Sequence, residues 1–208
     1  MIKAFLFDMD GTLADSESHY VGGTFSYFKE HGYKGSFKDV SCIMGLNMDQ
    51  TYKFISKSLN VSYEKAKELN DTYFKEHPLR YKDYIFGETK EILEYLHNNG
   101  YKLALCSSND IDSINNFLDL GYRKYFDLVI NPKEITNNKP DPEIYLKAIE
   151  KLGINKDEAV VVEDSYNGIL AGVNSGIYTI AKENKKFGTD QTKANKIVKS
   201  LLELKNYY

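Results

Sequence analysis

The sequence has few of the residues that mark disulfide-rich or zinc-binding proteins. Its 208 residues include two cysteines, four prolines and no tryptophan. Cys42 and Cys106 lie far apart and outside any C-x-x-C spacing, so the sequence predicts neither a disulfide framework nor a zinc site. Unpaired cysteines are typical of a reducing compartment, and we therefore expect a cytoplasmic protein.

Long apolar runs and an excess of positive charge are also missing. The N-terminal apolar run, residues 4–7, is too short for the hydrophobic region of a signal peptide, and no run is long enough to span a bilayer. The formal net charge is -3, and the lysines of 182–186 and 193–205 are interpreted as a solvated surface. We expect a monomer that binds neither a membrane nor nucleic acid.

The sequence does contain short apolar runs that alternate with segments of helical length. Buried parallel strands are expected at 2–7, 103–106, 126–130, 159–162 and 177–180. Helices are expected at 88–99, 111–120 and 142–152, each of which is followed by a glycine. This alternation predicts an α/β fold with a doubly wound, Rossmann-like parallel sheet.

One connection is much longer than a crossover between parallel strands requires. It runs from Gly11 to Tyr101, and its contents are typical of helices: 16–30, a helix that begins at Asn47, and a helix capped by Ser62 that reaches Glu76. We therefore expect a helical cap domain of residues 16–80, inserted into a catalytic core formed by 1–15 and 81–208.

Polar side chains follow four of the predicted strands. Because ligands bind beyond the carboxyl ends of the strands in open α/β sheets, these residues are the candidate site. They are Asp8 and Asp10 after the first strand, with Gly11 next to them, Ser107, Ser108 and Asn109 after the second, Lys139 beyond the third, and Glu163 and Asp164 after the fourth.

The mixture of carboxylates, hydroxyls and one ammonium indicates a site for a metal and a phosphate. Carboxylates from two strands repel each other unless a cation lies among them, and Mg²⁺ prefers oxygen ligands, so Asp8 and Asp164 are expected to bind Mg²⁺. Lys139, Ser107 and backbone amides of the first loop would bind the phosphate, and Gly11 would leave that loop room to approach it.

The first two carboxylates suit two different chemical roles. Asp8 ends a strand and can attack phosphorus in line, which would form an aspartyl-phosphate. Asp10 lies two residues further on, and it can protonate the leaving oxygen and later deprotonate the attacking water.

These residues resemble the four motifs of the haloacid dehalogenase superfamily. The resemblance is carried by Asp8-Met9-Asp10-Gly11-Thr12, by Ser107 after an apolar strand, by Lys139-Pro140-Asp141-Pro142, and by Glu163-Asp164-Ser165 followed by Gly168. It covers the whole predicted core, and the helical insert and Asp15-Ser16-Glu17 resemble the β-phosphoglucomutase-like group with a small cap.

The resemblance implies a role for each matched residue. Asp8 would be nucleophile and metal ligand, and Asp10 would be the acid/base while binding metal through its backbone carbonyl. The hydroxyl of Ser107 and Lys139 would bind phosphate. The acidic pair Glu163 and Asp164 would hold Mg²⁺.

Two positions separate the sequence from activities found in neighbouring groups. Asp10 favours phosphoryl transfer, since true dehalogenases are expected to lack the acid/base Asp. In the segment 45–48, Met48 aligns with an Arg of the mutase and with the Schiff-base Lys of phosphonoacetaldehyde hydrolase. An uncharged Met48 cannot hold a distal phosphate as an Arg would. The sequence therefore predicts a phosphatase that acts on a small phosphorylated metabolite such as a sugar phosphate.

Two alternatives remain. A phosphomutase is possible if another cap cation replaces the missing charge, the candidates being Lys53, Lys57, Lys75 and Arg80. A phospho-accepting regulatory domain would use similar residues, but it needs no cap and carries its acidic pair on the first strand, the reverse of the order here.

Overall fold

The computed structural model describes residues 1–44, 46 and 48–207. This part of the chain divides into two compact units, one formed by 1–14 with 81–208 and the other by 15–80. The first unit contains a parallel sheet, and the second is helical. The predicted boundary differs from this division at residue 15.

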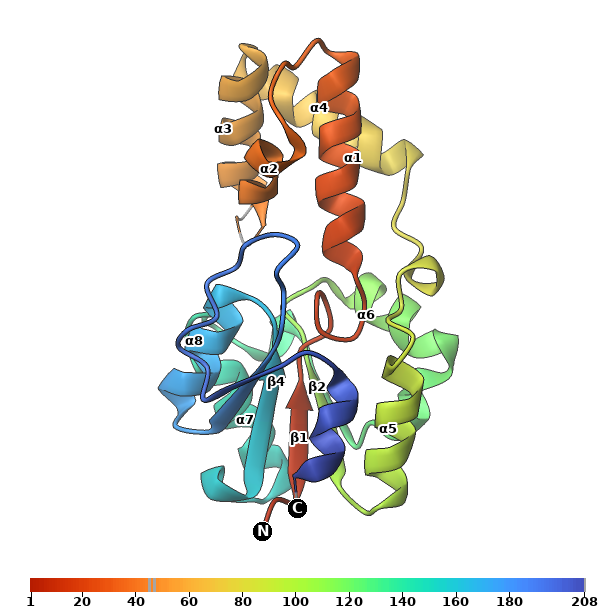
Figure 1. Ribbon diagram of the computed structural model, residues 1–208, viewed down its shortest axis with the longest axis vertical. Coiled ribbons are helices and arrows are strands. Elements are labelled where there is room, and N and C mark those ends of the chain that lie inside the picture. Colours follow the sequence, from red (N-terminus) through yellow and green to blue (C-terminus); the bar gives the residue numbers. More distant parts are fainter. Residues whose placement is uncertain (45, 47, 208) are drawn as a thin grey trace. The chain divides into compact units, whose positions relative to one another are not determined.

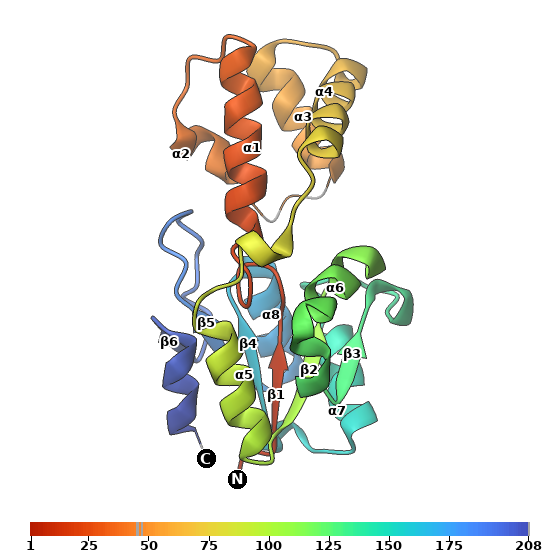
Figure 2. The same cartoon turned by 90° about the vertical axis from the view of Figure 1, so that its right-hand side faces the viewer.

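The first unit is built on a six-stranded sheet with the order β3-β2-β1-β4-β5-β6, in which every neighbouring pair is parallel. Strands β1, β2 and β4 are labelled in Figure 1, and β3, β5 and β6 can be followed in Figure 2. The strands are β1 (Ala4–Phe7), β2 (Lys102–Cys106), β3 (Leu128–Ile130), β4 (Ala159–Glu163), β5 (Tyr178–Lys182) and β6 (Lys196–Val198). The strand order reverses after β1, which makes the sheet doubly wound. The predicted Rossmann-like α/β fold is confirmed.

The central strands are apolar because helices cover both faces of the sheet. Helices α5 (Thr89–Asn98) and α6 (Ile111–Phe117) lie on one face, and α7 (Glu143–Leu152) and α8 (Tyr166–Ser175) lie on the other (Figure 2). All five residues of β4 are buried, as parallel strands between two helical layers require. On the face covered by α7 and α8, side chains such as Leu6, Val161 and Tyr145 form a buried apolar cluster.

Three elements of this unit differ from the expectation. Helix α6 ends at Phe117 and continues as a π-helical turn, Leu118–Tyr122, because Gly121 has a φ of 100° and interrupts the helix. Pro142, instead of Asp141, occupies the N-cap of α7, although Asp141 Oδ1 still accepts a hydrogen bond from the Glu143 amide at 2.9 Å. Strand β6 was not predicted, because its apolar residues are two, Ile197 and Val198, and a lysine stands on either side of them.

The second unit contains the helices α1 (Ser16–Glu30), α2 (Phe37–Val40), α3 (Met48–Leu59) and α4 (Tyr63–Glu76). Ser62 caps α4 by accepting a hydrogen bond from the Lys65 amide at 3.2 Å, as its position before the helix predicts. The predicted helix start at Asn47 lies outside the described residues.

Short helical turns complete the described chain: Ser41–Ile43, Tyr81–Asp83, Arg123–Tyr125, Pro132–Glu134, Lys156–Glu158 and Leu201–Asn206. A search of the described residues finds no helix with the length and apolar content needed to cross a membrane.

The close packing of α8 on the sheet gives a stability prediction. A Cβ at Gly172 would lie 2.4 Å from Thr179 Oγ1 and 3.0 Å from Val161 Cγ1. Since Thr179 is buried and rigid in β5, we expect Gly172→Ala to lower the free energy of unfolding by about 1–3 kcal/mol in urea titrations. Gly87→Ala is the matched control in the same unit, because nothing lies within 4 Å of its Cβ. Equal stability of the two variants would contradict this account of the helix packing.

Candidate active site

The register of the sheet brings the strand-end residues together. Phe7 of β1 pairs with Leu105 of β2 and with Val162 of β4. The residues that follow, Asp8, Cys106 and Glu163, therefore lie level with one another at the carboxyl edge. Residues separated by more than 150 positions in sequence become neighbours in this way.

Lys139 lies at the centre of the polar cluster. Its Nζ donates to Asp8 Oδ1 at 2.5 Å, to Glu163 Oε1 at 2.7 Å and to the carbonyl oxygen of Cys106 at 3.0 Å. Burial by itself lowers the pKa of Lys139, but the charges and hydrogen bonds of Asp8 and Glu163 outweigh burial and hold that pKa above its ordinary value. Lys139 is therefore a buried cation shared by two carboxylates.

Both oxygens of Glu163 are occupied by donors. Besides Lys139, Oε1 accepts from the hydroxyl of Tyr145 at 2.8 Å. Oε2 accepts from the amide of Asp164 at 3.1 Å and from the amide and hydroxyl of Ser165 at 3.3 and 3.2 Å. A Cβ at Gly168 would lie 1.8 Å from Oε1, so only glycine leaves room for this carboxylate.

Three carboxylates form a group that fits a divalent cation. One oxygen from each of Asp8, Glu163 and Asp164 lies within 4.8 Å of the other two. Burial, followed by the charge of Glu163, raises the pKa of Asp8 well above its ordinary value, although Lys139 opposes the shift. A cation among these oxygens would relieve that repulsion, and hard oxygen ligands suit Mg²⁺.

Asp164 is held from two sides. Asn184 Nδ2 donates to Oδ2 at 2.9 Å, and the hydroxyl of Thr12 lies 3.4 Å from Oδ1. Gln191 Nε2 donates to the backbone carbonyl of Asp164 at 2.7 Å, and Gln191 Oε1 accepts from the amide of Asn184 at 3.1 Å. The loop after β5 therefore fixes both the side chain and the backbone of Asp164.

Gly11 gives Asp164 its space. It has a φ of +79°, and a Cβ there would lie 2.1 Å from Asp164 Oδ2. We expected Gly11 to leave the first loop room to approach a ligand. In the structure, the group that lies against Gly11 is the carboxylate of Asp164.

Asp10 lies outside the acidic group. Its Oδ1 accepts from the hydroxyl of Tyr81 at 2.9 Å, and its Oδ2 accepts from Asn109 Nδ2 at 3.0 Å. The two aspartates of the first loop therefore have different environments, one beside an ammonium and carboxylates and the other between two neutral donors.

The three polar residues after β2 differ in exposure. Ser107 is buried, and its hydroxyl accepts from the amide of Asn109 at 3.1 Å. Ser108 is exposed. Asn109 contacts Asp10, and Asp110 caps α6 by accepting from the Ser113 amide at 2.9 Å.

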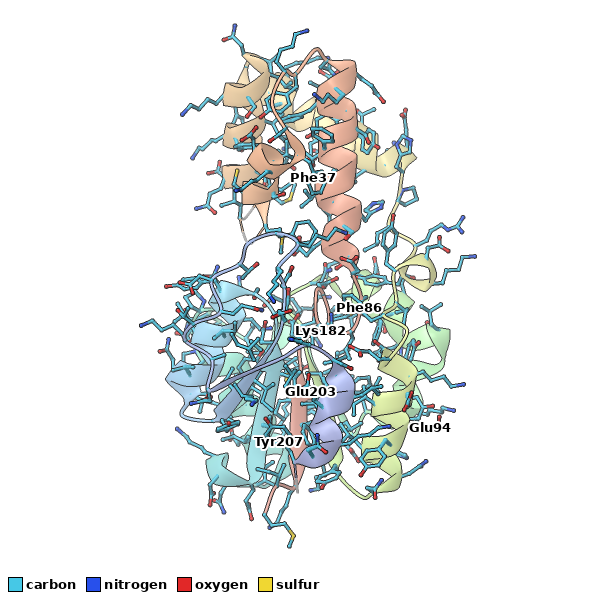
Figure 3. All side chains as sticks on the ribbon, in the orientation of Figure 1. Phe37, Phe86, Glu94, Lys182, Glu203 and Tyr207 are labelled. Atoms are coloured by element: carbon cyan, nitrogen blue, oxygen red, sulfur yellow. The ribbon has the colours of Figure 1, made fainter. Side chains whose placement is uncertain are left out.

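The carboxyl end of β5 carries a second buried cation that the sequence analysis assigned to a solvated surface. Lys182 is 7% exposed, and its Nζ lies 3.1 Å from the centre of the Phe86 ring (Figure 3). That interpretation is wrong for Lys182, because the apolar stem continues β5 into the core and an aromatic face lies against the ammonium.

Four residues of this network were missed in the sequence: Tyr81, Tyr145, Asn184 and Gln191. The sequence contains a weak indication of Tyr145, because this residue lies one helical turn after Pro142, the last residue of the segment that begins with Lys139. Tyr81 lies in a short helical turn and Asn184 and Gln191 in irregular segments. None of these segments has a periodic pattern, and only the folded chain brings them to the carboxylates.

Comparisons with known proteins identify the family of the chain. The family model described as haloacid dehalogenase-like hydrolase matches residues 5–182. The chain belongs to this family. The resemblance seen in the four motifs is confirmed, and the protein is an enzyme, which leaves the alternative of a phospho-accepting regulatory domain without support.

Relatives within the haloacid dehalogenase-like hydrolases differ in their named substrates. The chain is 29% identical to the pyrophosphatase PpaX of Bacillus velezensis, over 86% of this chain and 82% of the relative. It is 28% identical to a phosphorylated carbohydrates phosphatase of Thermotoga maritima, over 86% and 84%. A β-phosphoglucomutase structure from Clostridium difficile has a TM-score of 0.72 at 24% identity, over 98% and 93%, and shows the shared fold.

The acidic group predicts a metal-dependent gain in stability. The raised pKa of Asp8 means that the metal-free folded protein loses stability as pH rises through that pKa. Mg²⁺ should reverse this loss, so we expect it to raise the midpoint of thermal unfolding more at about pH 7.5 than at about pH 5.5, where protons compete with it.

Matched variants show whether this gain comes from the acidic group. Asp164→Asn should reduce the gain from Mg²⁺, and the exposed Asp119→Asn should keep it. An equal gain in Asp164→Asn and the native protein would place the metal elsewhere.

Proposed function

We propose that this chain is a Mg²⁺-dependent phosphatase that hydrolyses a small phosphorylated metabolite through an aspartyl-phosphate on Asp8. The observation that carries the proposal is the separation of the two aspartates of the first loop. Asp8 lies beside Lys139 and the acidic group, whereas Asp10 is held by Tyr81 and Asn109. Two carboxylates in different environments can take the roles of nucleophile and acid/base.

In the first step, a carboxylate oxygen of Asp8 would attack phosphorus. The bond from phosphorus to the leaving oxygen breaks, and Asp10 gives its proton to that oxygen. In the second step, water attacks the phosphorus of the aspartyl-phosphate and Asp10 takes its proton. Inorganic phosphate leaves, and Asp8 returns as a carboxylate. The neighbouring Cys106 is a poor rival nucleophile, because burial raises the pKa of its thiol to about 12.

The remaining strand-end residues would bind the metal and the phosphate. Asp8 and Asp164 would offer carboxylate ligands and Asp10 its backbone carbonyl, while Glu163, whose oxygens already accept hydrogen bonds, would add its charge to the site. The bound Mg²⁺ would neutralise phosphate charge as it develops.

The phosphate itself would be held by neutral donors and one cation. We propose that Lys139, Ser107, Ser108, Asn109 and the backbone of Gly11 bind it. The expected cytoplasmic location and the assignment of the helical unit as a substrate-selecting cap are parts of the same proposal.

Sugar phosphates and pyrophosphate are the first candidate substrates in this proposal, which is supported by relatives named as a pyrophosphatase and as a phosphorylated carbohydrates phosphatase. A phosphomutase remains the second candidate, because the same fold carries that activity. Water is favoured as the final acceptor, since Met48 is uncharged and 52% exposed. Among the cap cations, Lys53 already pairs with Asp49 at 2.6 Å. Gly45 and Asn47 lie outside the described residues.

Asp8→Asn tests the nucleophile. We expect it to lower Mg²⁺-dependent phosphate release by at least about a thousandfold, because the covalent step is lost. Asp119→Asn, which changes an exposed aspartate of the same unit, is the control. Full phosphate release by folded Asp8→Asn would show that the nucleophile lies elsewhere.

Product analysis separates phosphatase from mutase and identifies the substrate class. The enzyme is incubated with Mg²⁺ in ¹⁸O-labelled water with a hexose 1-phosphate or with pyrophosphate, and the products are followed by ³¹P NMR. A phosphatase puts ¹⁸O into inorganic phosphate. Transfer of phosphate to another hydroxyl of the hexose, without ¹⁸O, would establish the mutase instead.

A further inference from the structure

Asp10 is enclosed by two donors that also contact each other. Tyr81 Oη donates to Asp10 Oδ1 at 2.9 Å, and Asn109 Nδ2 donates to Asp10 Oδ2 at 3.0 Å. Asn109 Nδ2 also lies 3.1 Å from Tyr81 Oη, to which it donates. Each oxygen of this carboxylate therefore has its own donor, and each of the three side chains contacts the other two.

Tyr81 is a fixed partner in this set. Its side chain is 3% exposed, and its ring packs edge-on against Phe117 of α6 at 6.2 Å between ring centres. The segment after it is tied to the first loop, because the hydroxyl of Thr89 donates to the carbonyl of Leu13 at 2.7 Å and Ile85 bridges to Ala14. The hydroxyl of Tyr81 is therefore held in place relative to the loop that carries Asp10.

Asn109 is fixed in the same way. The backbone N–H of Asn109 donates to the hydroxyl of Ser107 at 3.1 Å, and the side-chain Oδ1 of Asn109 accepts from the backbone N–H of Asp110 at 2.8 Å. With the side-chain oxygen occupied, Nδ2 faces Asp10 and Tyr81. The tyrosine and the asparagine thus come from two different segments of the chain, and both are held against α6, Tyr81 by its contact with Phe117 and Asn109 by its bond to the N-cap residue Asp110.

We infer that Tyr81, together with Asn109, is a positioning residue for Asp10. This inference rests on the proposed function, in which Asp10 gives a proton to the leaving oxygen. Without the hydroxyl of Tyr81, Oδ1 of Asp10 loses its donor, and the side chain of Asp10 can leave the position that it holds between Tyr81 and Asn109. An acid displaced by about 1 Å loses much of its effect on the rate.

The proton balance of this step leaves Tyr81 unchanged. Asp10 carries the proton and gives it to the leaving oxygen as the bond to phosphorus breaks. The carboxylate that results accepts hydrogen bonds from the phenol and the Asn109 amide. Tyr81 keeps its own proton throughout, so its contribution is orientation of Asp10 and stabilisation of the carboxylate product.

The test compares two esters that differ in how much they need an acid. Tyr81→Phe removes the hydroxyl and keeps the ring against Phe117. Phenyl phosphate has a poor leaving group that needs a proton, whereas p-nitrophenyl phosphate has a similar shape and needs less help. We expect kcat/KM to fall about tenfold for phenyl phosphate and about threefold or less for p-nitrophenyl phosphate. The value kcat/KM reports the step in which the leaving group departs.

Tyr125→Phe is the matched control. Tyr125 is buried in the same unit, and among the described residues its hydroxyl has no hydrogen-bond partner. This variant should keep the native ratio between the two esters. A variant that is partly unfolded gives the same ratio, because both esters are measured on one preparation.

Each outcome decides the inference. The inference is overturned if the ratio of kcat/KM for the two esters in Tyr81→Phe lies within about twofold of the native ratio. It is also overturned if the activity of Tyr81→Phe rises, which would mean that the phenol holds Asp10 away from the substrate. Failure of the proposed function would appear separately, as undiminished phosphate release by Asp8→Asn.

Discussion

The buried contact of Lys139 with Asp8 and Glu163 is the interaction on which the rest of the site depends. Three segments of the sheet edge, from β1, β4 and the loop beyond β3, are joined by one ammonium. Removing a charge from such a group would leave its partners unpaired in a buried place, which is strongly unfavourable. The same contact holds Asp8 at the point where β1 ends.

Small residues make this arrangement of charges possible. A side chain at Gly11 would displace Asp164, and one at Gly168 would displace Glu163. Both glycines therefore leave the space that a carboxylate occupies, in addition to any role in a turn. The loop after β5 completes the arrangement, since Asn184 and Gln191 fix Asp164 in side chain and backbone.

The different environments of Asp8 and Asp10 relate this arrangement of charges to the proposed reaction. Asp8 lies beside an ammonium and two carboxylates, whereas Asp10 accepts hydrogen bonds from two neutral donors, although only Met9 lies between them in the sequence. The chain belongs to the haloacid dehalogenase-like hydrolase family. Relatives named as a pyrophosphatase and as a phosphorylated carbohydrates phosphatase match the chain at 29% and 28% identity, so overall identity does not distinguish between these two named substrates.

The sequence by itself determined the elements whose signals are local. Apolar runs predicted β1 to β5, the helix-length segments between them predicted α5 and α7, and the polar strand ends predicted that Asp8, Lys139 and Asp164 would share one edge. These predictions succeed because parallel strands place their carboxyl ends together. The sequence missed β6, because its two apolar residues, Ile197 and Val198, lie between lysines and form no apolar run.

Only the tertiary structure decided which partners each polar group has. Tyr81 lies in a short helical turn and Asn184 and Gln191 in irregular segments, and no local pattern indicates that they contact Asp10 or Asp164. Lys182 shows the same limit, since its burial against Phe86 depends on a residue almost a hundred positions away. Periodicity reports which face of an element is buried, but the partner of a buried polar atom is set by how the whole chain packs.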